Sequence, residues 1–176
     1  MMEYFLLRQL AENPVRPVLP EPGNYPYRLT HQNFEGMPTG SVAYFRYGDE
    51  EQMPGILLQP TFMVNDTIRS VMELYDDTIR FKTLALLPDV IDRMTDSSVS
   101  YSIPDIKCYE CLHEDCVVMP DGTVKRLVVD HRKIPNADVF SIKETTHNRV
   151  LVSLRMAESI SRRNVYGVEF ERVEVR

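Results

Sequence analysis

The amino-acid sequence predicts an α+β fold in which two main helices pack on a largely antiparallel sheet. One observation is a plan of strand, capped helix and strand that occurs near residue 65 and again near residue 153. Another is a set of short β-rich runs separated by turn residues. The third is size and composition, since 176 residues with 43% hydrophobic and 26% charged content are ordinary for one folded domain.

The C-terminal copy of this plan begins with a β-rich run over 149–153. Ser153 is a good helix N-cap, and the residues after it predict a helix over 154–163. Its apolar side consists of Leu154, Met156, Ala157 and Ile160. Glu158 stands four residues before Arg162, which is the favourable order for an ion pair along a helix.

A closing strand is predicted over 168–175, after Gly167 releases the chain from the helix. Its apolar residues change phase between Phe170 and Val173, and a bulge is one explanation. Arg162 and Arg163 fall in the last turn of the helix, where cations complement the carbonyl end. We therefore interpret the arginine pair as a helix end and not as a phosphate site.

The N-terminal copy has Asn65 as the predicted N-cap of a helix over 66–76. The apolar stripe of this helix is Ile68, Val71, Met72 and Tyr75. Two carboxylates at Asp76 and Asp77 are unfavourable at a helix C-terminus, so the helix is expected to stop there. A strand through 79–87 follows. Because identity between the copies is low, the shared architecture is the prediction, and duplication is only one explanation for it.

The remaining chain divides by composition. Residues 1–60 are expected to form a Pro-rich arm with the first strands, and 61–176 the main α+β part of one domain. Prolines and glycines over 12–40 predict little regular structure there. Further strands are predicted at 41–47 and 139–142, and a hairpin with Asp121-Gly122 at its tip.

Charge and cysteine content limit the environment and partners of the protein. Three cysteines are an odd number, and neither a signal peptide nor a membrane span is evident, so a cytoplasmic location is expected. The net charge of -6 argues against nucleic acid as a partner. An acidic surface suits a basic protein instead, because opposite charge steers association.

Four potential metal ligands lie close together in the sequence: Cys108, Cys111, His113 and Cys116. Structural zinc sites usually use two ligand pairs separated by a longer loop, so four ligands within nine residues are too crowded. We therefore expect no metal and no cofactor, with zinc binding by this set as the alternative.

Motifs for catalysis are missing from the sequence, which has no nucleophile elbow, no P-loop and no dinucleotide-binding glycine pattern. The run Asp130-His131-Arg132 is interpreted as a strand end, because adjacent residues rarely hold the opposed geometry of an acid–base pair. A protein without enzymatic activity is therefore expected.

The chain resembles a family of bacterial immunity proteins from polymorphic-toxin systems, the domain of unknown function 1629. The similarity covers about residues 60–175. It rests on Phe62-Met63-Val64-Asn65, on Tyr101 to Ile106 before Cys108, on Val139 to Ile142, and above all on Leu151 to Phe170.

This resemblance implies a cytoplasmic protein that binds a cognate toxin and neutralises it by occlusion. The alternatives are an adaptor with another partner and a small enzyme or metal-binding protein that uses the cysteine cluster. If the toxin is basic, the exposed acidic residues are the expected contact points: Asp49, Glu50, Glu51, Glu110, Glu114 and Asp115.

Overall fold

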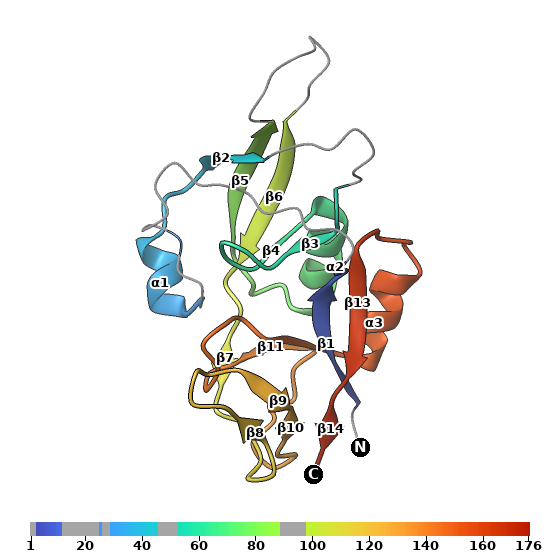
Figure 1. The fold of residues 1–176 in the computed structure, drawn as a ribbon. Helices are drawn as coiled ribbons and strands as arrows, with labels where there is room; N and C mark the ends of the chain where they lie inside the picture. The colour runs from blue at the N-terminus through green and yellow to red at the C-terminus, as the bar shows by residue number, and fades with distance from the viewer. Residues whose placement is uncertain (1–2, 12–24, 26–28, 46–52, 89–97) are drawn as a thin grey trace.

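Two five-stranded sheets form the framework of the fold, and each carries one of the two longer helices (Figure 1). The computed structural model describes residues 3–11, 25, 29–45, 53–88 and 98–176. The α2 sheet has the order β2 (Ser41–Phe45), β5 (Phe81–Pro88), β6 (Val99–Pro104), β4 (Met63–Val64), β3 (Ile56–Leu57). The α3 sheet has the order β13 (Val168–Arg172), β1 (Tyr4–Gln9), β12 (Val150–Ser153), β11 (Val139–Ile142), β7 (Cys108–Tyr109). The predicted α+β class is confirmed, but the strands form two main sheets where one was expected.

The two longer helices follow their predicted caps. The helix α2 spans Asp66–Tyr75, and α3 spans Leu154–Ser161. The Asn65 side chain accepts a hydrogen bond from the backbone N–H of Ile68 at 3.0 Å. The Ser153 hydroxyl accepts one from the backbone N–H of Met156 at 3.4 Å. In the described part of the chain, no helix is long and apolar enough to cross a membrane.

Both sheets are built on the same arrangement of four strands. In the α2 sheet, β4 and β5 lie on either side of β6 and are antiparallel to it, and α2 connects them. In the α3 sheet, β12 and β13 lie on either side of β1 in the same way, and α3 connects them. The strand before each unit also pairs alike, β3 with β4 and β11 with β12. The repeated strand-helix-strand plan is thus present in the topology.

Residues 1–60 contribute strands to both sheets, β1 to the α3 sheet and β2 and β3 to the α2 sheet. The strand β1 is an internal strand of the α3 sheet, with β12 on one side and β13 on the other. A short helix, α1 (His31–Gly36), stands within the region 12–40, for which little regular structure was predicted. Thr30 caps it by accepting a hydrogen bond from the Asn33 N–H, and Phe34 is its one buried residue. A single apolar residue gives no periodicity, which is why the sequence pattern did not predict α1.

Two smaller strand pairs complete the described strands. One is the predicted hairpin of β8 (Val117–Val118) and β9 (Val124–Arg126), and Gly122 at its tip has a φ of 82°. The other is a parallel pair of β10 (Val128–Val129) and β14 (Glu174–Val175). The phase slip before Val173 is therefore not a bulge. The strand β13 pairs with β1 up to Arg172, and the chain then changes partner to β10.

Three groups of buried residues hold these elements together. The central core joins α2, α3 and the inner faces of both sheets, and includes Val64, Ile68, Met72, Val152, Met156 and Ile160. A second core on the other side of the α2 sheet joins it to α1, and includes Phe34, Phe45, Leu84 and Tyr101. A third covers the outer face of the α3 sheet, and includes Tyr4, Cys111, Val129, Phe140 and Leu151. Each sheet is therefore covered on both faces.

Candidate functional site

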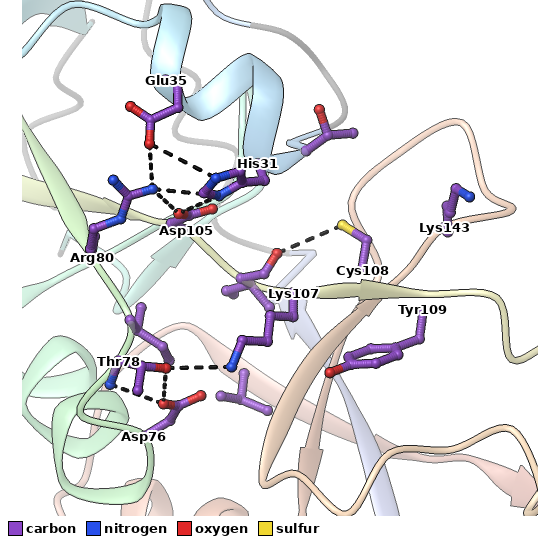
Figure 2. Close-up of a pocket in the computed structure, with 14 residues that line it drawn as sticks. His31, Glu35, Asp76, Thr78, Arg80, Asp105, Lys107, Cys108, Tyr109 and Lys143 are labelled. Atoms are coloured by element: carbon purple, nitrogen blue, oxygen red, sulfur yellow. Dashed lines mark hydrogen bonds and ion pairs between the residues drawn. The ribbon is translucent and has the colours of Figure 1, made fainter.

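A depression of about 770 Å³ lies where α1, the α2–β5 connection, the β6–β7 connection and the end of β11 meet (Figure 2). Its polar lining residues are Thr30, His31, Glu35, Asp76, Thr78, Arg80, Asp105, Lys107, Cys108, Tyr109 and Lys143. They come from sequence positions more than a hundred residues apart. Concave sites lined by several convergent polar side chains are the default candidates for binding.

Arg80 is at the centre of an ion-pair network on one side of the depression (Figure 2). Its guanidinium nitrogen lies 2.5 Å from a Glu35 carboxylate oxygen and 2.6 Å from a carboxylate oxygen of Asp105. The Asp105 side chain is 10% exposed, and His31 Nδ1 lies 2.9 Å from the same oxygen. Hydrogen bonds to Asp105 and then to Glu35 raise the pKa of Arg80. Together these contacts tie α1 to the start of β5 and the end of β6.

The same residues have the spacing of a cation site. One ligand atom from each of His31, Glu35 and Asp105 lies within 4.8 Å of the others. Imidazole and carboxylate together suit divalent metals such as zinc. However, the Arg80 guanidinium already contacts both carboxylates and supplies the positive charge that a metal ion would bring. The arrangement is complete as an internal ion-pair network.

A turn after α2 forms the second side of the depression. One carboxylate oxygen of Asp76 accepts hydrogen bonds from the backbone N–H and the hydroxyl of Thr78, at 3.0 and 2.5 Å. The ammonium of Lys107 lies 3.5 Å from the Thr78 hydroxyl oxygen and has no carboxylate partner among the described residues. Lys107 is thus the cation of the depression that remains available to an incoming group.

Glu110, one of the predicted partner-binding residues, lies beside the depression. Its carboxylate accepts a hydrogen bond of 2.5 Å from the ammonium of Lys143, which lines the depression. This bond lowers the pKa of Glu110. The Glu110 carboxylate, which was predicted to be free for steering, is therefore paired with Lys143, the residue that follows β11.

The other predicted acidic residues differ in their surroundings. Asp115 forms an ion pair with Arg176, whereas Glu114 is exposed and has no ion pair within the described part of the chain. Asp49, Glu50 and Glu51 lie outside the described residues. Among the three described residues of this set, Glu114 is therefore the clearest unpaired acidic group.

The structure does not bring Cys108, Cys111, His113 and Cys116 together. No three of their potential ligand atoms lie within 4.8 Å of one another. Cys111 is fully buried in the third core, and burial raises the pKa of its thiol to about 12. The thiols of Cys108 and Cys116 donate to the backbone carbonyls of Leu29 and Arg126, at 3.3 and 3.2 Å. These contacts are those of structural thiols.

Two buried carboxylates serve the fold. Hydrogen bonds from the Arg132 side chain lower the pKa of Asp130 to about 2. At Asp138, burial acts to raise the pKa, but hydrogen bonds from Arg155 and Ser153 outweigh it, so the net shift is downward. The Ser153 hydroxyl lies 2.5 Å from the carboxylate of Asp138, and it is also the N-cap of α3. This contact fixes the start of α3 to Asp138, the residue that precedes β11.

The sequence reasoning missed the residues of the depression. His31 and Glu35 lie four residues apart on α1, whereas Arg80 and Asp105 come from two other segments, and no spacing pattern links them to α1. Asp105 alone stands in a segment, Tyr101 to Ile106, that the family resemblance had marked. Since their proximity is created by tertiary packing, only the folded structure reveals it. No protein-family model matches the chain, and a search of curated proteins finds no match.

Proposed function

We propose that this protein is a non-catalytic immunity protein that binds a cognate bacterial toxin and neutralises it by occlusion. The supporting observation is the state of the reactive side chains in the depression. Glu35 and Asp105 share the guanidinium of Arg80, and Cys108 donates to a backbone carbonyl. A general base or nucleophile needs an open approach to substrate and a pKa suited to proton transfer. An internally paired network favours binding over chemistry.

The family resemblance is the basis for proposing a toxin as the partner. The segment Leu151 to Phe170, which carries the strongest similarity, forms β12, α3 and β13 as a continuous unit. The net charge of -6 complements a basic toxin, and many toxins that act on nucleic acid are expected to be basic, because phosphate binding requires a positive surface. An acidic surface then accelerates association, which matters for an inhibitor of a toxin that acts repeatedly.

Co-expression tests the proposal directly. The toxin domain encoded by the neighbouring open reading frame is expressed with this protein and, in parallel, alone. We expect growth to be restored by co-expression and the two proteins to purify as a stable complex. A Cys108→Ser variant should protect equally well, because binding by occlusion does not need the thiol. A thiol-dependent enzyme would instead lose its activity. Loss of protection with this variant would favour the enzyme alternative, and the absence of any complex would contradict immunity by occlusion.

The acidic residues make a second, kinetic prediction. Reversing Glu110, Glu114 and Asp115 together to Lys should slow association with the toxin by about tenfold at low salt, with a smaller effect on dissociation. Reversal of Asp49, Glu50 and Glu51 tests the other predicted surface in the same assay. A matched variant that exchanges Glu110 and Glu114 for Asp and Asp115 for Glu keeps the charge and should bind as wild type. Unchanged association in both triple reversals would place the toxin elsewhere.

A further inference from the structure

The strand β13 forms one margin of the α3 sheet, beside β1 (Figure 1). Alternate residues of an antiparallel strand direct their backbone groups to opposite sides. Val173 donates its N–H to the Tyr4 carbonyl, and Leu10 donates to the carbonyl of Gly167. By the same alternation, Glu169 and Glu171 bond to β1. The backbone groups of Val168, Phe170 and Arg172 therefore point away from the sheet.

These outward groups have no hydrogen-bond partner in the described part of the chain, where β13 pairs with β1 alone. The helix α3 packs mainly on β1 and β12. The Gly55 backbone lies against Val168 at the start of β13, and no described strand pairs with the outward side of the strand. An edge strand with open N–H and C=O groups is a template for an added strand. The five residues of β13 thus offer a row of three bonding positions.

The side chains of β13 give the two faces of the edge different chemistry. Val168 and Phe170 pack against the central core, so their face is apolar up to Arg172, which is paired with Glu3. Glu169 and Glu171 alternate with them on the other face and are exposed. A carboxylate oxygen of Glu171 lies 2.6 Å from a guanidinium nitrogen of Arg8, whereas Glu169 has no ion pair with a described residue. A strand that fits this edge needs apolar residues on one face and basic residues on the other.

A second copy of this chain does not fit. Antiparallel self-pairing centred on Phe170 would place Glu169 opposite Glu171 of the other copy. Centring on Glu169 or on Glu171 would place each glutamate opposite itself. Like charges directly opposite each other destabilise a strand pair. The three registers that use most of β13 are therefore disfavoured for a homodimer, and an alternating basic strand is favoured by the same charges.

We infer that the exposed edge of β13 binds an extended segment of a basic protein partner by strand addition, with alternate Lys or Arg residues opposite Glu169 and Glu171. The backbone bonds provide affinity, and the alternating side chains provide selectivity. This inference rests on the proposed function for its biological partner, because the cognate toxin is the protein expected to supply the strand. It adds to that function a binding mode and a surface separate from the depression.

Nuclear magnetic resonance of the full chain tests the edge without any toxin, so failure of the immunity proposal would leave the result interpretable. In the free protein, the amides of Val168, Phe170 and Arg172 should exchange with solvent quickly, and those of Glu169 and Glu171 slowly. The probe is the acetylated and amidated peptide Lys-Val-Lys-Val-Lys-Val-Lys. Adding it should shift the three outward amides and slow their exchange by about tenfold. The same peptide with Glu in place of Lys should leave them unchanged.

A pair of charge reversals provides the control. Glu169→Lys should weaken binding of the lysine peptide by about threefold to tenfold, because it replaces an attractive cross-strand pair by a repulsive one. Asp77→Lys changes the net charge equally at an exposed residue of the α2–β5 connection, outside the predicted acidic contact set, and should leave binding as in wild type. Strand addition at β13 is overturned if the outward amides are already protected in the free protein. It is equally overturned if the lysine peptide leaves them unshifted, or if Asp77→Lys weakens binding as much as Glu169→Lys.

Discussion

The two strand-helix-strand units share a topology but use their helix-to-strand connections for opposite purposes. After α2, residues 76–80 enter the depression and carry Asp76, Thr78 and Arg80. After α3, residues 162–167 turn back onto the other half of the molecule, where the Tyr166 carbonyl accepts a 2.7 Å hydrogen bond from the Gly55 N–H. One connection thus presents polar groups, and the other joins the two sheets. A repeated scaffold can support both because its core packing leaves the connections free to differ.

The largest expected effect concerns the core that the two units share. Ile68 from α2 and Ile160 from α3 are both fully buried in the central core. Replacing either with Ala should lower the free energy of unfolding by about 2–5 kcal/mol, because each change leaves a cavity. Since both helices belong to one core, each variant should still unfold in a single transition, followed by circular dichroism and by fluorescence of the tyrosines. Two separate transitions would show that the units are independent domains.

Two glycines with positive φ, Gly167 in the α3–β13 connection and Gly40 before β2, provide a sharper comparison. Gly167 has a φ of 73°, and an added Cβ would collide with the side chain and backbone of Pro54. Gly40 has a similar φ of 83°, but a Cβ there would meet nothing within 4 Å. Gly40→Ala should therefore cost only about 1 kcal/mol of backbone strain. Gly167→Ala should cost about 3 kcal/mol, since the collision adds to that strain. Equal losses in urea unfolding would mean that the Pro54 contact does not hold the units together.

The smallest expected effect is a difference between the two helix caps in how their stability depends on pH. The amide cap of α2, Asn65, does not titrate, whereas Ser153 at α3 is bonded to Asp138. The folded-state pKa of Asp138 lies below its ordinary value of 3.8. The contribution of the ionised Asp138 carboxylate to the free energy of unfolding is therefore complete above a pH of about 4. It is lost as the pH falls through the lower, folded-state pKa. Wild type should lose more stability from pH 6 to pH 3 than Asp138→Asn does.

Amide exchange locates this effect within the molecule. Acid should weaken protection at Met156, whose N–H is bonded to Ser153, more than at Ile68, whose N–H is bonded to Asn65. The two amides hold equivalent positions in their helices, so each serves as the control for the other. Equal acid sensitivity at both positions would remove the proposed role of Asp138 at the α3 cap.

The sequence predicted those parts of the fold that depend on local pattern. Both helices begin at the predicted caps Asn65 and Ser153, because capping and apolar periodicity act over a few residues. Strand pairing is not local, and so the division into two sheets and the internal position of β1 did not follow from the pattern. The same limit applies to the candidate site. Arg80, Glu35 and Asp105 meet only through packing of α1 against the α2 sheet, and no spacing rule connects them.

The position of β1 has a consequence for synthesis of the chain. Its six residues are made early, yet the strands that flank it, β12 and β13, end at Ser153 and Arg172. The described strands of the α2 sheet are complete once residue 104 has left the ribosome. The α3 sheet must wait until the chain is made as far as Arg172, because contacts between such distant residues require closure of a long loop. During that interval the apolar residues of β1, such as Tyr4 and Leu7, have no native neighbours in their sheet. A chaperone that binds short apolar segments would therefore meet this protein at β1.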